Sequence, residues 1–221
     1  MTDSALILFL KYPERGSVKT RIAASLGDDF AFGLYTAFIK DLLGMAGFVE
    51  ADKILAIDEP EGIPVASLDF GTGYPVIRQN GRDIGYRMLN AFEYVFNSGY
   101  RKAVLIGSDL PDLPAASVEN AFAALDTTDA AIGRSTDGGY YLIGFRKDTC
   151  SPDYFKGIKW STSLVFQRTI EKFSRLKKSI YMLPEWIDID DQNDLKLFYE
   201  RNSNRTGTAL YTMKYLTEIY P

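Results

Sequence analysis

Short apolar runs without alternation recur along the chain and predict buried strands. The first is ALILFL at residues 5–10, and AVLIG at 103–107 has the same character. Residues 54–57 and, more weakly, 130–133 form similar runs. Continuous apolar runs of this length are typical of strands in a parallel sheet that is covered by helices on both faces.

Helical spacing of apolar residues separates these runs. Residues 31–42 and 84–95 each place apolar side chains three and four positions apart on one face. Further helices are expected after Pro114, over 164–173, and from the Asp190–Asp191 pair onward. The alternation of strands and helices predicts an α/β fold with three layers, α/β/α, and residues 140–145 add one more strand beside a Gly-Gly turn.

The 221 residues fit one domain, and no repeat or low-complexity linker divides them. We therefore predict a single domain over residues 1–221. Residues 203–221 are polar and then aromatic. They predict a C-terminal helical extension that packs on the body of the molecule or on a second subunit, so a homodimer is one expectation.

The chain contains no histidine and one cysteine, Cys150. These counts exclude Ser-His-Asp and Cys-His catalytic sets, histidine-ligated metals, cysteine-cluster metals and internal disulfides. The remaining chemistry belongs to carboxylates, lysine, arginine, hydroxyls and backbone amides. Any metal is therefore expected to be oxygen-ligated, as Mg²⁺, Mn²⁺ and Ca²⁺ are.

Charge and hydropathy limit the partners. The net charge of −4 and the pI near 5.0 argue against a nucleic-acid-binding protein, which usually carries a basic face. No apolar run reaches the ~20 residues that span a membrane. The first ten residues lack the basic start of a signal peptide. Together with the lone cysteine, this predicts a cytoplasmic protein.

A cationic, glycine-containing loop, KYPERGSVKTR, follows the first predicted strand at residues 11–21. Ligands of open α/β sheets bind at the carboxyl ends of the strands. Backbone amides in such a loop favour phosphate, and Lys19 and Arg21 supply positive charge. The spacing is not that of a P-loop. From these residues alone, a solvated surface loop explains the segment equally well.

The segment GSDLPDLP at 107–114 places acidic residues where another buried strand ends. Asp109 stands directly at the strand end, where a carboxylate can hold a divalent cation against a diphosphate. Asp112 lies closer to the next helix, so helix capping is its expected role.

Two further segments place carboxylates near turns. In DGGYYLIG, Asp137 precedes two glycines that permit close approach of a ligand or another backbone, and a tight Asp-Gly turn is the simpler interpretation. In WIDIDDQNDL, Asp188 and Asp190 alternate along an extended segment and therefore face one side. Clustered carboxylates repel one another unless solvent or a cation neutralises them. Asp191 is expected to cap the helix that follows.

Weaker patterns concern a further arginine and an aromatic segment. Arg87 lies near the start of a predicted helix, where phosphate binding and helix capping by its neighbours are equally compatible with the sequence. In IKWST, Ser161 or Thr162 is expected at a helix N-cap, and Trp160 as a wall or core residue.

The order of these motifs is more specific than any one of them. From residue 5 to about residue 200, the KTR loop, GSDLPDL, DGGYYLIG, IKWST and DIDDQNDL follow one another. This series resembles bacterial glycosyltransferase-like proteins known as radical-SAM/selenodomain-associated transferases. More distantly, it is similar to 2-phospho-L-lactate guanylyltransferase and other nucleotidyltransferases of the GT-A fold.

The resemblance implies a nucleotide-diphospho-sugar transferase (GT-A) fold with a mixed but mostly parallel sheet and a nucleotide along its carboxyl edge. It implies phosphate binding by the loop after the first strand and metal binding by three carboxylates, and Arg87 is a further candidate for binding the phosphates. It also implies that Asp109 and Asp137 are catalytic and that a third group of residues lies on the acceptor side. The phosphate group comprises Lys11, Gly16, Lys19, Arg21 and Arg87; the metal group comprises Asp109, Asp188 and Asp190; the acceptor group comprises Gly138, Gly139, Trp160, Ser161 and Thr162.

The expected activity is metal-dependent transfer of a sugar from a nucleotide-diphospho-sugar to a small-molecule acceptor, with Mg²⁺ or Mn²⁺ as cofactor. One alternative is nucleotidyl transfer from a nucleoside triphosphate to a phosphorylated acceptor, with release of pyrophosphate. A non-catalytic nucleotide-binding module is the other. The same loop and carboxylates would serve all three.

Overall fold

A computed structural model describes residues 2–60, 63, 70–205, 207 and 209–219. In this part of the chain, seven strands form one sheet in the order β3-β2-β1-β4-β6-β5-β7. Only β6 runs antiparallel to its neighbours β4 and β5. The predicted mixed, mostly parallel sheet is therefore confirmed. The strands are β1 (Ser4–Lys11), β2 (Asp52–Asp58), β3 (Val76–Arg78), β4 (Lys102–Ile106), β5 (Ala130–Ser135), β6 (Tyr140–Arg146) and β7 (Ile180–Trp186).

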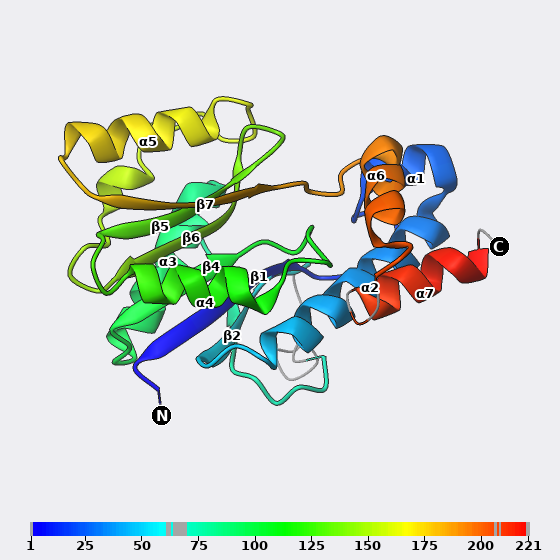
Figure 1. The fold of residues 1–221 in the computed structure, drawn as a ribbon, viewed down its shortest axis with the longest axis horizontal. Helices are drawn as coiled ribbons and strands as arrows, with labels where there is room; N and C mark the ends of the chain where they lie inside the picture. Colours follow the sequence, from blue (N-terminus) through cyan, green and yellow to red (C-terminus); the bar gives the residue numbers. More distant parts are fainter. Residues whose placement is uncertain (1, 61–62, 64–69, 206, 208, 220–221) are drawn as a thin grey trace.

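Helices cover both faces of the sheet, as the unalternating apolar strands predict (Figure 1). Alternate residues of β1 enter opposite cores: Leu6 and Leu8 join the cluster of α2 (Asp28–Ala46) and α4 (Ala115–Ala124). Ile7 joins the cluster on the other face, with α3 (Ile84–Asn97) and α5 (Val165–Arg175). A short 3-10 helix, η2 (Pro152–Tyr154), lies before α5. The three-layer prediction is confirmed.

A third apolar cluster lies beyond the carboxyl ends of the parallel strands. It joins α2 to α1 (Thr20–Leu26), α6 (Gln192–Asn202) and α7 (Leu210–Ile219), and these helices form the group at the right of Figure 1. The carboxylate of Asp41 in α2 accepts the backbone N–H groups of Tyr211 and Thr212 at 2.9 and 2.8 Å. The predicted C-terminal helix therefore packs on the body of its own chain. The homodimer stays a prediction.

The single cysteine is a packing residue. Cys150 lies half-buried against the α3–α5 face of the sheet. Burial, reinforced by the nearby charge of Glu93, raises the pKa of its thiol to about 12. Across the described residues, no helix combines the length and apolar character needed to cross a bilayer.

Candidate functional site

The structure brings predicted phosphate and metal residues together at the carboxyl edge of the sheet. Lys11, Lys19 and Arg21 come from the end of β1 and the segment after it, Asp109 follows β4, and Asp190 precedes α6. All five line one pocket of about 310 Å³. The pocket therefore combines three cationic groups with two carboxylates at the place where open α/β sheets bind ligands.

Gly16 shapes the cationic loop and is not among the residues that line the pocket. Its φ of 75° lies in the left-handed region, which glycine adopts without a steric penalty. The turn is closed by the Ser17 N–H, which donates to the carbonyl of Glu14 at 3.1 Å. Lys11 then donates from Nζ to the Ser17 carbonyl at 2.7 Å. Gly16 therefore sets the loop's path, and the lysines provide its charge.

Lys19 lies between the two carboxylates. Its Nζ is 2.7 Å from Asp109 Oδ1 and 3.4 Å from Asp190 Oδ1. The Ile189 N–H donates to the Asp109 carbonyl at 3.0 Å, and this backbone contact brings the loop after β4 beside the acidic segment. Arg21 is more exposed and reaches Asp190 at 3.8 Å. Residues far apart in sequence thus share one electrostatic site.

Tyr35 is a pocket residue that the sequence reasoning missed. The helical spacing of apolar residues over 31–42 predicted only that Tyr35 is buried, which it is. Its hydroxyl accepts the Lys11 N–H at 3.0 Å and shares a 2.9 Å hydrogen bond with Ser108 Oγ. Burial raises its pKa far above the ordinary value, with Asp109 adding to the effect. Tyr35 therefore stays neutral and ties the ends of β1 and β4 together; only the need of a buried tyrosine for a partner could have indicated this role.

A second pocket, of about 460 Å³, adjoins the first because Arg21 and Asp190 line both. Asp137 and Asp188 line the second pocket. Burial, with added repulsion from Asp137, Asp109 and Asp190, raises the pKa of Asp188 to about 7. Its Oδ1 is buried and accepts no hydrogen bond from any described residue.

The turn between β5 and β6 explains the two glycines. Asp137 Oδ1 accepts the Gly139 N–H at 2.7 Å, so the predicted Asp-Gly turn is present. Gly138 has a φ of 92°, and an added Cβ would lie 2.2 Å from the Ser163 carbonyl oxygen. The sequence left open whether a ligand or another backbone approaches these glycines. At Gly138 it is another backbone, that of Ser163. Gly139 does line the second pocket.

Trp160 forms a wall of the second pocket. Its indole lies against Gly85, where an added Cβ would be 2.2 Å from the ring, and it meets Tyr140 edge-on with centroids 6.4 Å apart. Ser161 and Thr162 also line the pocket. The expectation that one of them caps the next helix is wrong.

The cap of α5 lies further along the chain. Leu164 is the N-cap residue and makes no side-chain cap bond. Thr162 Oγ1 instead donates to the Lys159 carbonyl at 2.9 Å, and Ser161 takes a φ of 58°. The segment turns once more before the helix begins, so both hydroxyl residues stay in the pocket wall.

Arg87 lies outside the lining of both pockets. It forms an ion pair with Asp58 at 2.9 Å at the end of β2. Helix capping, the other role considered for this segment, is observed: Asp83 is the N-cap of α3, and its side chain accepts the Tyr86 N–H at 2.9 Å.

Asp112 does not cap a helix, which corrects its expected role: the N-cap of α4 is Pro114. The Asp112 side chain is fully buried and forms a bidentate pair with Arg201, at 2.6 and 2.8 Å. It also accepts from Asn202 at 2.8 Å and from Trp186 Nε1 at 3.0 Å. This network fastens α6 and the end of β7 to the loop that carries Asp109.

The predicted cap at Asp191 is confirmed. Its side chain accepts the N–H groups of Asn193 and Asp194, and the Asp194 carboxylate accepts the Asp191 N–H. This capping box fixes the start of α6, and it holds the backbone next to Asp190.

The Asp109 and Asp190 carboxylates are suitable ligands for a hard cation, but they do not form a complete coordination site by themselves. Among the described residues, no three acidic side chains gather closely enough to hold a metal ion. Asp109 and Asp190 already share one positive group, the Lys19 ammonium. Mg²⁺ is commonly held by one or two carboxylates together with substrate phosphates and water. The donor set therefore fits a metal that arrives with a phosphate ligand.

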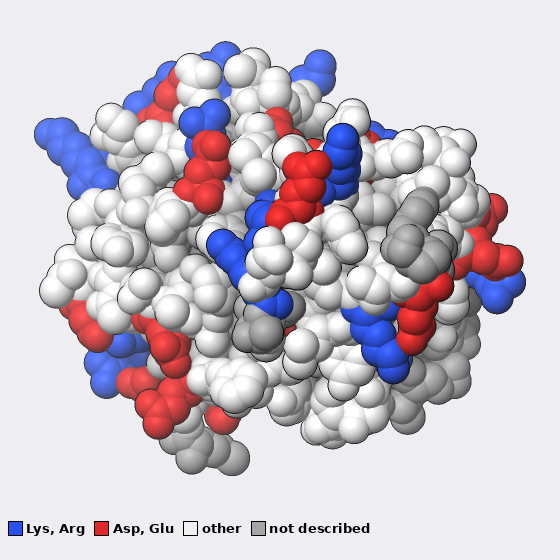
Figure 2. Space-filling view, turned by 45° about the vertical axis from the view of Figure 1, so that its right-hand side comes forward, with Lys and Arg blue, Asp and Glu red and all other residues white. Residues whose placement is uncertain are grey.

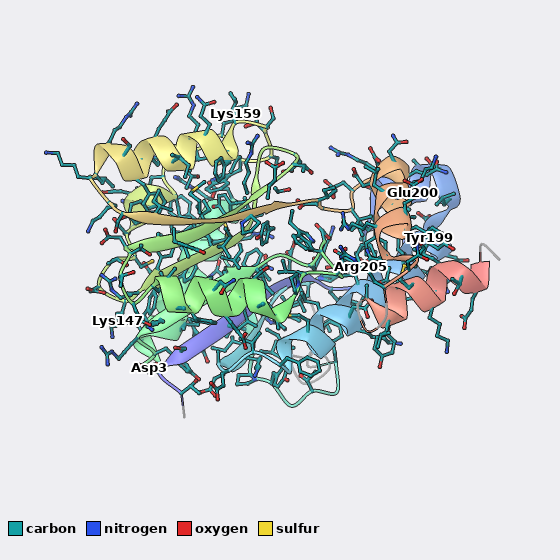
Figure 3. The ribbon with its side chains drawn as sticks, viewed as in Figure 1. Asp3, Lys147, Lys159, Tyr199, Glu200 and Arg205 are labelled. Atoms are coloured by element: carbon teal, nitrogen blue, oxygen red, sulfur yellow. The ribbon has the colours of Figure 1, made fainter. Side chains whose placement is uncertain are left out.

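Charges of both signs are interspersed over one face of the molecule. On the face shown in Figure 2, lysine and arginine side chains alternate with aspartate and glutamate rather than gathering in one broad basic area. In Figure 3, Tyr199 and Glu200 mark α6, and Lys159 marks the segment leading into α5, so the helices on either side can be located. This face therefore lacks the broad basic area that a nucleic-acid-binding surface usually carries.

Solved structures share this fold. A candidate nucleotide-diphospho-sugar transferase from Desulfovibrio desulfuricans G20 is 39% identical, with a TM-score of 0.94 over 99% of this chain and 95% of that one. A cytidylyltransferase from Leptospira borgpetersenii is 13% identical, with a TM-score of 0.58 over 100% and 96%. Rv0371c of Mycobacterium tuberculosis, in complex with manganese, is 13% identical, with a TM-score of 0.52 over 89% and 98%.

The two distant matches show the fold alone, whereas the 39% identical protein is a full-length relative. A search of the curated proteins finds no match. A family model described as an uncharacterized protein conserved in bacteria (DUF2064) matches residues 42–162, more than half of the chain. The fold is that of the nucleotide-diphospho-sugar transferases, and the chain belongs to the DUF2064 family.

Proposed function

We propose that the protein is a metal-dependent transferase that moves a sugar from a nucleotide-diphospho-sugar to a small-molecule acceptor. The observation that carries this proposal is the pocket in which Lys11, Lys19 and Arg21 meet Asp109 and Asp190. A cationic wall suits a diphosphate, and adjacent carboxylates suit the divalent cation that accompanies it. The 39% identical relative, itself a candidate nucleotide-diphospho-sugar transferase, supports the same class of reaction.

In this proposal, Lys11, Lys19 and Arg21 bind the diphosphate, and Asp109 and Asp190 hold Mg²⁺ or Mn²⁺. Asp188, in the adjoining second pocket, is a further candidate ligand that would have to approach the other two carboxylates. The bound cation would neutralise the charge that develops on the departing nucleoside diphosphate. The manganese complex of Rv0371c supports the choice of metal. Phosphate binding by Arg87 would require it to leave Asp58, so we rank it below the three pocket cations.

The second pocket would hold the sugar and the acceptor. Asp137 is the proposed base for the acceptor hydroxyl, because one of its oxygens accepts no hydrogen bond from the described residues and the residue lines this pocket. Trp160 would pack against an apolar sugar face, and Ser161 and Thr162 would offer hydroxyl groups. Gly138 would act by letting the turn pack against the Ser163 backbone.

We also propose that the protein works in a reducing compartment, the cytoplasm, because its one cysteine is a free, half-buried thiol.

The test is a thermal-shift screen of nucleoside diphosphates, triphosphates and UDP-, GDP-, CDP- and dTDP-sugars, with and without Mn²⁺ or Mg²⁺. A ligand that binds the folded state raises the melting temperature. Metal-dependent stabilisation by one nucleotide-sugar, followed by its turnover, is the expected result. Preference for the matching triphosphate would instead support nucleotidyl transfer, as in the cytidylyltransferase of the same fold.

Asp109→Asn tests the proposed metal role. We expect it to lose metal-dependent turnover by about a hundredfold or more, while the free protein still folds, with a melting temperature lowered by the loss of the Lys19 ion pair. Asp148→Asn, at an exposed carboxylate, is the matched control. Full activity of Asp109→Asn would reject the proposed metal role, and nucleotide binding without turnover under all conditions would indicate a binding module.

A further inference from the structure

The ammonium of Lys19 is saturated with partners. It donates to Asp109 Oδ1 at 2.7 Å, to Asp190 Oδ1 at 3.4 Å and to the Ile189 carbonyl at 2.6 Å. An ammonium has three N–H donors, and each has an acceptor here. The side chain is 5% exposed. Lys19 is therefore a fixed internal cation of the pocket, unlike Arg21, whose side chain is 75% exposed.

The local backbone is unusual in the same place. Lys19 has φ and ψ of 46° and lies in the left-handed region directly before α1. Residues other than glycine rarely adopt this conformation. The ammonium also lies over the ring of Phe38, 5.6 Å from its centroid. These contacts direct the Lys19 ammonium toward the gap between the two carboxylates.

We propose that Lys19 is the resident counter-ion of the Asp109–Asp190 pair and has to withdraw before these carboxylates can share a divalent cation. This inference rests on the proposed function. Two cations cannot occupy the gap together, because each would repel the other at short range. A buried ammonium also cannot give up its partners without acquiring another anion.

A diphosphate in the same pocket supplies that anion. Lys19 lines the pocket along with Lys11 and Arg21, so a short shift transfers its donors from the carboxylates to phosphate oxygens. The metal and the nucleotide then bind with positive coupling, since each removes the obstacle to the other. The free protein keeps its carboxylates neutralised and holds a metal weakly until nucleotide arrives.

The test measures Mn²⁺ affinity by calorimetry and by electron paramagnetic resonance of free Mn²⁺. Wild type, Lys19→Met and the control Lys214→Met, at a lysine 74% exposed on α7, are each titrated alone and with ADP, CDP, GDP or UDP. Without nucleotide, Lys19→Met is expected to bind Mn²⁺ about tenfold or more tightly than wild type. Lys214→Met is expected to match wild type.

Nucleotide provides the second readout. At least one diphosphate should tighten Mn²⁺ binding to wild type by about tenfold, after correction for its own Mn²⁺ complex, and should have a smaller effect on Lys19→Met. Should Lys19→Met fail to fold, the same titrations are made on Lys19→Gln and compared with wild type. Lys19→Gln provides a second variant with a neutral polar side chain.

Tight Mn²⁺ binding by wild type without nucleotide, equal to that of Lys19→Met, would overturn this inference and leave the proposed metal role intact. Absence of Mn²⁺ binding by every protein, with every diphosphate, would overturn the metal-dependent function and the inference with it.

Discussion

Asp112 is fully buried, and its two carboxylate oxygens accept four hydrogen bonds, two of them from Arg201. Burial by itself would raise the pKa of this carboxyl, but the bonds from Arg201, Asn202 and Trp186 outweigh burial and hold the pKa below its ordinary value. A buried pair of this kind is costly to break, because one partner remains without a counter-charge.

Asp112→Asn should therefore destabilise the protein by about 2–3 kcal/mol at pH 7. Since the folded pKa is depressed, the stabilisation is complete above the unfolded value near 3.8 and is lost as the pH falls through the folded value. Urea unfolding at pH 7, 4 and 3 should show the gap between wild type and variant closing toward acid. The exposed Asp126→Asn serves as control, and a constant gap would contradict the assignment.

The same residue marks a limit of prediction from sequence. Asp109 was placed correctly at a strand end because the apolar run before it is local information. Asp112 was expected to cap a helix, since its partner Arg201 is 89 positions away and no local pattern joins them. The Lys19 contacts with Asp109 and Asp190 are equally non-local, so the sequence could name the residues but not the ammonium between the carboxylates.

At the scale of elements, the β5–β6 turn can be tested apart from ligand binding. An added Cβ at Gly138 would meet the Ser163 backbone at 2.2 Å, whereas at Gly139 it would meet the movable Asp137 carboxylate at 3.1 Å. Gly138→Ala should lower the stability by about 2 kcal/mol or more, and Gly139→Ala by under about 1 kcal/mol. Urea unfolding of the two variants checks this expectation. Equal losses would show that the backbone contact does not dictate Gly138.

Strands could be predicted from the sequence where their side chains are buried on both faces of the sheet. The strands β1 and β4 are apolar along their length because helices cover both faces. The edge strand β7 was missed because Tyr181 and Met182 are exposed and Pro184 interrupts the run, so neither a continuous nor an alternating pattern is present. β3, with three residues, is too short to give a pattern.

For the whole molecule, the candidate site lies between two parts, the sheet and the third apolar cluster, which share helix α2. Asp109 belongs to the sheet, whereas Lys19 and Asp190 precede α1 and α6 of the helical cluster. A ligand that contacts all three residues should restrain the cluster against the sheet.

We therefore expect Mn²⁺ plus a bound nucleoside diphosphate to slow amide hydrogen exchange in α1 and α6 by about fivefold or more. Exchange in α4, which lines neither pocket, should change little. Mass spectrometry of peptides covering these helices, with and without ligand, makes the comparison. Slowing in α4 alone, or in none of the three helices, would contradict a site that joins the two parts.

The packing of Cys150 has a practical consequence. Because burial raises the pKa of its thiol to about 12, very little of this group is thiolate near neutral pH, and alkylating reagents attack the thiolate. The native chain therefore behaves as a nearly thiol-free background for maleimide chemistry. A cysteine introduced at the exposed Lys159, next in sequence to the pocket-wall residue Trp160, could carry a fluorophore or spin label near the second pocket, so that ligand arrival can be followed without changing a residue that lines it.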